Sequence, residues 1–367
     1  MSKINNINER VKREFYLYLN EAKGFCDSTV NQIANAINLY EDFTKSSDFS
    51  TFNKDKAIEF KDWLEKRKYR GKTISVTTYY TYLSHLRKFF TWLCMQAGYK
   101  SKINPDSVDY LRISKKEKRI ATQPTPRKYP SLKDVLYLIK SIPVNTEIDK
   151  RDRALIAFTL LSGMRDKAIV TLPLNCFDEE NLIINQNPRQ DVQTKFSKQI
   201  TTILFKFDGG LVQIVLNWVK YLKDKGFTPD DPMFPKTKSM QSEDGLSFEV
   251  SDKVEPYFWK GTGSIRKIFQ ERAKKADLPY FPPHSFRHLA IDLAVKRCEN
   301  GAQIKAVSQN FGHEKVATTF SAYANYEPDR LSEILKSIDF NGEANFKNDD
   351  ALGEIKDLLH QLIKNKQ

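Results

Sequence analysis

The sequence has few cysteines, no long apolar run and no clustered acidic motif. Its four cysteines lie far apart without a CxxC pair, which disfavours a zinc site or a disulfide framework and fits a reducing cytoplasm. No stretch reaches the roughly eighteen apolar residues of a membrane span. The polar start, MSKINNINERVKREF, lacks the apolar core of a secretion signal. No DxD, DDE-like or HExxH pattern indicates a catalytic metal.

Basic residues are in excess. Lys and Arg number 59 against 46 Asp and Glu, which gives a net charge of +13 and a pI near 9.3. Such a surplus favours a polyanionic partner, because each neutralised phosphate releases counterions. Charge alone leaves open a basic protein with no nucleic-acid partner.

The 367 residues exceed the usual size of one domain, and the patterns divide into four parts. Residues 1–113 show apolar spacings of three and four, which predict an all-helical domain. Residues 114–130 are basic and contain prolines, as expected of an extended linker. Residues 131–340 mix helical patterns with a small antiparallel sheet, and residues 341–367 form a tail with one amphipathic helix. The expected fold class is mainly α, with an α+β second domain.

Four finer expectations follow from local patterns. The alternating stretch NLIINQNPRQDVQTKFSKQITTILF predicts the sheet. The polar residues 236–261 predict a loop or insertion. The aromatic residues of SVTTYYTYLSHLRKFFTWLCMQAGY recur at helical spacing and favour packing in a core over base stacking. The apolar stripe of 349–365 fits packing on its own domain or on a neighbouring subunit.

Candidate chemistry gathers late in the chain. PPHSFRH places His284 and Arg287 three residues apart at a helix start, on one face, and leaves His288 to a structural role. Arg165 follows an apolar helix in LLSGMRDKAI, where an arginine is costly unless an anion meets it. FGHEKVATTFSAYANYEP adds His313 and two tyrosines.

Together with a hairpin lysine, these residue types suit phosphoryl transfer without a metal. Guanidinium groups stabilise charge on the phosphorane oxygens. A lysine or histidine can protonate the departing oxygen, and a positioned hydroxyl can attack phosphorus.

Four motifs in order, SGMRDKAIVTL, VQTKFSKQITTI, HSFRH and FGHEKVATTFSAY, resemble the boxes of the tyrosine recombinases, the phage-integrase family. The match spans about residues 131–340, and the helical region 8–113 resembles the family's core-binding domain. The resemblance implies that Arg165 and Arg287 clamp the non-bridging oxygens of the scissile phosphate. It implies that His284 hydrogen-bonds that phosphate or takes the nucleophile's proton.

The same resemblance assigns three further roles. Lys195 on the β-hairpin is the general acid for the leaving 5′ oxygen. His313 contacts the phosphate or fixes the nucleophile. Tyr323 attacks and forms a 3′-phosphotyrosyl link, which a 5′ hydroxyl from a partner duplex reverses. Neither ATP, a metal nor another cofactor is required.

Two positions depart from the family pattern. An acid is usual three residues after the first arginine, where this chain has Ala168. Three alternatives stay open: Asp166 substitutes, a later acid such as Asp178 substitutes, or the support is absent. Tyr323 follows His313 by ten residues, where nine is more frequent and ten also occurs. Tyr326 lies thirteen residues away and is the less favoured nucleophile.

Lys198 competes with Lys195 for the role of general acid. We favour Lys195 because we expect it to end a strand, with Lys198 in the turn.

The resemblance further implies double-stranded DNA as partner, a clamp of two domains around it, and a tetramer on two recombination sites. An accessory DNA-bending or directionality protein is a further expected partner, and the bacterial cytoplasm or nucleoid the expected location. VSQNFGHEKVATTF is more like integrases of mobile elements than resolvases of chromosome dimers. Two alternatives stay open: a topoisomerase IB-like relaxing enzyme, and a catalytically weak relative that only binds DNA.

Overall fold

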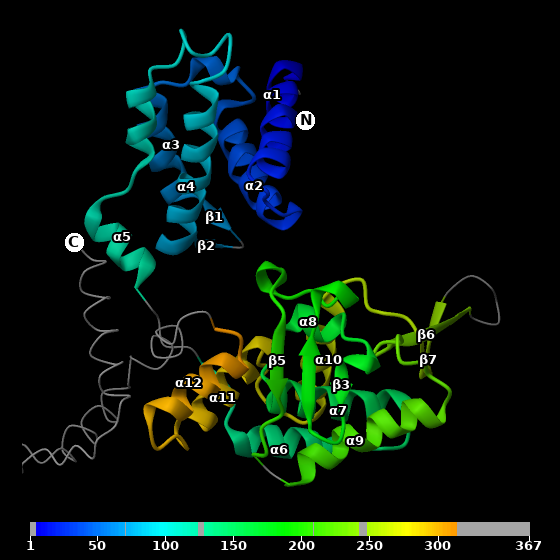
Figure 1. Ribbon diagram of the computed structural model, residues 1–367. Helices are drawn as coiled ribbons and strands as arrows, with labels where there is room; N and C mark the ends of the chain where they lie inside the picture. Colours follow the sequence, from blue (N-terminus) through cyan, green and yellow to red (C-terminus); the bar gives the residue numbers. More distant parts are fainter. Residues whose placement is uncertain (1–4, 70, 124–127, 208, 242–247, 314–367) are drawn as a thin grey trace, which may run out of the picture. The chain divides into compact units, whose positions relative to one another are not determined.

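The computed structural model describes residues 5–69, 71–123, 128–207, 209–241 and 248–313, and it divides the chain into two units, 1–123 and 124–367 (Figure 1). The predicted tail helix and both candidate tyrosines, Tyr323 and Tyr326, lie outside these residues. No helix in the described ranges combines the length and apolar character needed to cross a bilayer.

The first unit is a helical bundle with one very short hairpin. Its elements are α1 Asn6–Leu17, a π-helical turn Tyr18–Ala22, α2 Asp27–Thr44, α3 Lys54–Lys66, β1 Lys68–Tyr69, β2 Lys72–Thr73, α4 Val76–Leu93, a 3₁₀ segment Pro105–Leu111 and α5 Lys115–Thr122.

The core of this bundle is aromatic. Phe89 and Phe90 of α4 are fully buried, and the ring of Phe90 stacks on Phe52 with centroids 3.7 Å apart. The aromatic residues of α4 therefore include core positions, as predicted.

The expected extended linker begins instead with a helix. Ser114 and Glu117 form a reciprocal capping box that starts α5, and the Thr77 hydroxyl of α4 donates to the carbonyl of Ala121. The three-residue spacing of Ser114 and Glu117 is a sequence signal for the start of a helix. The basic composition of the stretch had favoured a linker instead. The expectation of an extended chain is wrong for residues 115–122.

The second unit packs helices around a small sheet. Its elements are α6 Leu132–Ser141, α7 Glu147–Ser162, α8 Asp166–Val170, β3 Phe177–Asp178, β4 Ile183–Gln186, β5 Ile200–Ile203, α9 Gly209–Asp224, β6 Lys236–Gln241, β7 Phe248–Glu255, α10 Gly263–Lys275, α11 Pro283–Val295 and α12 Gly301–Asn310.

The sheet β3–β4–β5 is antiparallel, with Ile183 opposite Ile203 and Gln186 opposite Ile200. The fold class is thus confirmed: mainly α, with helices before a small antiparallel sheet. Helix α7 is buried along almost its whole length and packs against α9 and α11. It forms the centre of the unit and ends beside the candidate site.

One prediction for this unit is wrong. Much of the stretch 236–261 forms the hairpin β6–β7 rather than a loop. Buried contacts stabilise it, because Arg151 of α7 donates to the Pro235 carbonyl and to the Thr237 hydroxyl. These strands are mostly polar and are anchored by contacts with residues of α7 that lie 84 to 107 positions away, which no local pattern reveals.

Candidate active site

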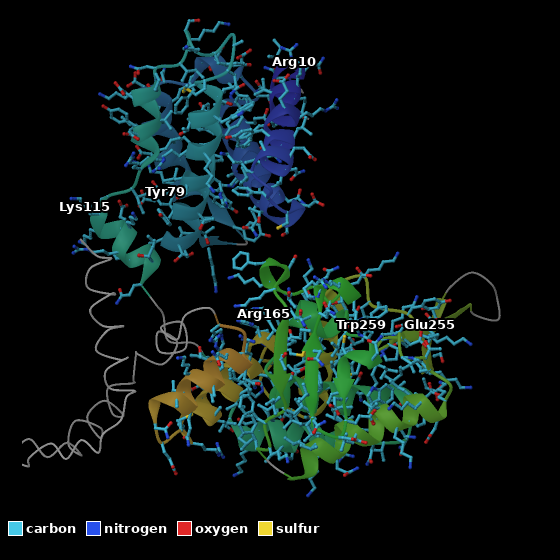
Figure 2. All side chains as sticks on the ribbon, in the orientation of Figure 1. Arg10, Tyr79, Lys115, Arg165, Glu255 and Trp259 are labelled. Carbon is cyan, nitrogen blue, oxygen red and sulfur yellow. The ribbon has the colours of Figure 1, made fainter. Side chains whose placement is uncertain are left out.

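Arg165 lies in the turn between α7 and α8 (Figure 2). Gly163 ends α7 in the left-handed conformation, with φ 54°, and Arg165 is the N-cap residue of α8. The guanidinium is partly buried, and this burial lowers the pKa of Arg165. Among the described residues it has no hydrogen bond or ion pair. A partly dehydrated cation without a protein partner favours an anionic ligand.

Arg287, on α11, joins three segments of the site. Its Nη1 donates to the carbonyl of Gly163 at 2.6 Å, and its Nη2 donates to the carbonyl of Phe311 at 2.7 Å. The same Nη2 lies 2.9 Å from His313 Nε2. The guanidinium carbon also sits 5.1 Å from the centre of the Phe311 ring. Only 4% of Arg287 is exposed. This arginine therefore links the three segments of the site from within and also gives the site positive charge.

Two glycines let these segments approach closely. A Cβ on Gly163 would lie 2.2 Å from Cε1 of Phe311, and a Cβ on Gly312 would lie 2.5 Å from Cδ1 of Ile200. Both glycines have positive φ, which favours glycine independently of the contact. The arginine turn, the histidine turn and β5 can therefore meet only with glycine at these positions.

Asn310 fastens the end of α12 to the sheet. Its Oδ1 accepts from the Ile203 amide at 2.7 Å, and its Nδ2 donates to the Ile203 carbonyl at 3.0 Å. The Thr202 hydroxyl donates to the Asn310 carbonyl at 2.9 Å. These bonds position His313 three residues later. The sequence patterns gave no role to Asn310 or Phe311, although Phe311 begins the FGH motif and Asn310 precedes it.

His313 is neutral at neutral pH. Burial, and then the charges of Arg287 and Arg165, lower the pKa of His313 from 6.5 to about 4. Since a guanidinium only donates, Nε2 accepts from Arg287 and the ring proton lies on Nδ1. Arg165 and Arg287 thus make the site electropositive beside the neutral ring of His313.

His284 lies one helical turn before Arg287 and is exposed. Its ring meets that of buried His288 edge to face, with centroids 4.9 Å apart. Residues three apart share a helix face, so His284 lies above Arg287 at the start of α11.

Lys195 does not lie on a strand, and the reason for preferring it to Lys198 is wrong. Lys195 begins the 3₁₀ turn Lys195–Ser197 in the loop between β4 and β5, whereas Lys198 has an extended conformation two residues before β5. Both side chains are exposed. The connection between β4 and β5 is a long loop and not a two-residue hairpin turn. Lys195 therefore lies within the loop and not at the end of a strand.

The acid that could replace the one missing at Ala168 does not contact Arg165. Asp166 pairs with Arg266 of α10 at 3.6 Å, and Asp178 accepts from the backbone and side chain of Asn181 in a turn. Ala168 itself is buried. Arg165 is therefore positioned by its backbone turn, and no described carboxylate fixes its side chain.

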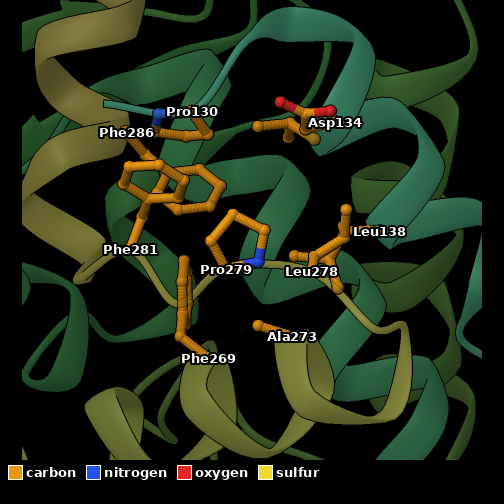
Figure 3. A pocket seen from close by; sticks show the side chains of 10 residues that line it. Pro130, Asp134, Leu138, Phe269, Ala273, Leu278, Pro279, Phe281 and Phe286 are labelled. Atoms are coloured by element: carbon orange, nitrogen blue, oxygen red, sulfur yellow. The ribbon is translucent and has the colours of Figure 1, made fainter. Parts of the chain in front are cut away.

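The chemistry of this group is that of a phosphate site. The part of the chain that the structure describes contains no cluster of His, Cys, Asp and Glu able to hold a metal ion. By contrast, a pocket between α6, α10 and α11 is apolar, with Phe269, Phe281 and Phe286 in its lining and Asp134 as its one charged residue (Figure 3). That pocket has no cation to meet a phosphate.

Comparisons with known proteins agree with the fold and with the motifs. Residues 132–330 match the phage integrase family, and residues 13–97 match the phage integrase N-terminal SAM-like domain. A probable integrase/recombinase of Aquifex aeolicus is 23% identical over 306 residues, covering 80% of this chain and 89% of its own. Tyrosine recombinase XerD of Listeria innocua is 21% identical over 330 residues, covering 88% and 96%.

Two solved structures share the fold. A lambda integrase dimer bound to a COC′ core site gives a TM-score of 0.59 at 12% identity, covering 87% of this chain and 97% of its own. The Tn1549 transposon integrase with a circular intermediate DNA gives 0.58 at 14%, covering 89% and 99%. The fold is that of a DNA strand transferase of the tyrosine type. The chain belongs to the phage integrase family.

The pKa of His313 predicts a pH dependence of stability. The unfolded chain binds a proton at this histidine near its ordinary pKa of 6.5, whereas the folded protein resists protonation down to about 4. Stability is therefore highest above 6.5 and falls as the pH drops through this window. Urea unfolding at pH 7.5 and pH 5 should show a smaller loss for His313→Gln than for wild type, both without DNA. Equal losses would contradict the assignment.

Proposed function

We propose that this protein is a site-specific recombinase that cuts and rejoins duplex DNA through a 3′-phosphotyrosyl intermediate and thereby integrates or excises a mobile element. The observation that carries the proposal is Arg165, a partly buried cation without a described partner, beside Arg287 and His313. A phosphodiester supplies the missing anion, and family membership supplies the reaction of cutting and rejoining.

In the proposed reaction the hydroxyl oxygen of Tyr323 attacks the scissile phosphorus, and His284 takes its proton. Arg165 and Arg287 stabilise the charge on the non-bridging oxygens. His313 supports that charge through Nδ1–H, since its Nε2 accepts from Arg287. The bond to the 5′ oxygen breaks, and Lys195 donates the proton that this oxygen gains. Attack by a 5′ hydroxyl of the partner duplex reverses each transfer and releases Tyr323.

The finer parts of the proposal rest on relatives. Transposon and lambda integrases share the fold, which supports a mobile element, while the XerD and XerC proteins are 21% and 23% identical to this chain. We also propose a tetramer on two sites in the cytoplasm or nucleoid, and an accessory DNA-bending or directionality protein. The net charge of +13 supports duplex DNA as the partner.

Covalent trapping tests this function. A duplex is first selected from a random pool by binding to the full chain, and a set of nicked versions then places a nick at each step. Wild type should form a denaturation-resistant complex with one of them, because the short leaving fragment diffuses away. Tyr323→Phe should abolish this complex, and the matched change Tyr326→Phe should leave it intact.

Each other outcome has a definite meaning. Trapping by Tyr323→Phe but not by Tyr326→Phe would move the nucleophile to Tyr326. DNA binding without trapping on any nicked duplex would favour the DNA-binding-only alternative, which the missing acid at Ala168 supports. Relaxation of supercoils without preference for the selected site would favour the topoisomerase alternative.

A further inference from the structure

Phe196 is the most exposed of the large apolar side chains in the described ranges, at 77%. It lies at the tip of the loop between β4 and β5, in the 3₁₀ turn Lys195–Ser197. Single exposed apolar residues are common on surfaces. Phe196 differs from an ordinary one because its backbone is held in an unfavourable conformation that turns the ring away from the protein.

The strain involves two successive residues. Phe196 has φ 61° and Ser197 has φ 50°, values that non-glycine residues adopt rarely. The Thr194 hydroxyl donates to the Lys198 carbonyl at 2.6 Å and closes the turn beneath them. Strained, non-glycine turns of this kind persist where the surroundings fix them, and they gather at functional sites.

Both ends of the loop are fastened to the candidate active site. On the incoming side the Gln193 amide donates to the Thr171 hydroxyl at 2.9 Å, at the end of α8, the helix that Arg165 begins. At about 1.5 Å per helical residue, this anchor lies roughly 9 Å along α8 from Arg165. On the outgoing side Ile200 contacts Gly312, next to His313. The two ends of the loop are therefore held next to segments that carry Arg165 and His313.

Lysines lie on both sides of Phe196 in the sequence of the loop. Lys195 Nζ lies 4.8 Å from the centre of the Phe196 ring, and the exposed Lys198 follows two residues later. A protein interface core is depleted of lysine, so an apolar ring between two lysines fits a protein partner poorly. Duplex DNA can meet both features of the loop. Phosphates border each groove and can pair with the lysines, and the apolar faces of the bases between them can contact the ring.

We propose that Phe196 is a wedge that enters the DNA groove beside the scissile phosphate and partly unstacks one base step. Lys195 and Lys198 meet the flanking phosphates, and seating the ring places Lys195 at the leaving oxygen. Apolar side chains that insert between base steps in this way are a recurrent means of kinking DNA. Phe196 is then a positioning residue. The inference rests on the proposed function for the identity of the scissile phosphate.

The test reads base unstacking without requiring cleavage. The full chain carrying Tyr323→Phe is bound to duplexes of the selected sequence, each with one 2-aminopurine at a different adenine position. Binding should raise the fluorescence at one or two neighbouring positions. Phe196→Ala should remove this rise and weaken binding by about tenfold, the scale of one lost stacking contact. Phe196→Trp should keep the rise, and Tyr137→Ala, a change at another exposed ring, on α6, should alter neither.

Three results would overturn the wedge. The first is an absence of any fluorescence rise with the parent protein, and the second is an equal rise with Phe196→Ala. The third is a change in the number of subunits on DNA with the fluorescence unaltered, which would assign the ring to a protein contact. A rise that depends on Phe196, combined with no covalent trapping by wild type, would uphold the wedge and refute the proposed recombinase.

Discussion

Arg165→Ala should lower the single-turnover rate of covalent DNA cleavage by about 10²–10³-fold, the usual cost of removing one donor from a transition-state charge site. Stability should stay unchanged or rise slightly, because the substitution removes a partly buried cation that no described residue pairs with. Arg165→Lys should recover part of the rate, since lysine keeps the charge but loses the planar fork.

Arg287→Ala should lose both activity and stability. The side chain is 4% exposed and satisfies the carbonyls of Gly163 and Phe311, so its removal leaves two buried acceptors without donors. At about 1–3 kcal/mol for each such group, we expect a loss of roughly 3 kcal/mol in the free energy of unfolding.

The contrast between the two arginines is measured at saturating protein on the nicked duplex, with thermal unfolding in parallel. Arg10→Ala, at a highly exposed arginine of α1, is the matched control and should change neither quantity much. An Arg165→Ala protein that cleaves at the wild-type rate, or that loses as much stability as Arg287→Ala, would remove Arg165 from the proposed site.

Local patterns predicted the helices of the second unit well, because α6, α9 and α10 have clear apolar spacing. The local patterns failed where contacts between residues distant in sequence determine the structure. No sequence pattern near Thr237 indicates that the buried Arg151 of α7 anchors the hairpin β6–β7. The position of Lys195 depended on loop length, which the strand pattern left undefined.

For the site, sequence motifs identified Arg165, Arg287 and His313, and the structure places these three together. What the motifs could not give is the reason the three meet. That reason is a set of close approaches: Gly163 against Phe311, Gly312 against Ile200, and Asn310 against β5. Each pairs residues that are distant in sequence, so no single stretch contains the signal. The roles of all six candidate residues stay predictions.

A buried network of ion pairs between α7 and α10 gives the second large expected effect. Asp152 on α7 accepts from Arg151 at 2.8 Å and from Arg272 of α10 at 2.8 Å, and Arg272 also pairs with Asp149. Burial acts to lower the pKa of Arg272, but Asp152 and Asp149 outweigh it and raise that pKa. The network therefore depends on its carboxylates to pair two buried guanidiniums.

Asp152→Ala should destabilise the second unit by about 3–5 kcal/mol, because it leaves Arg151 without its ion-pair partner and Arg272 with one carboxylate in place of two. The control Glu271→Ala removes an exposed acid from α10 and should cost less than about 0.5 kcal/mol. Hydrogen exchange of α7 and α10 amides measures this unit separately from the helical first unit. Similar protection in the two variants would show that the network adds little stability. A loss of amide protection in Asp152→Ala alone would show that these ion pairs hold α7 in place. The last turn of α7 leads into Gly163 and Arg165.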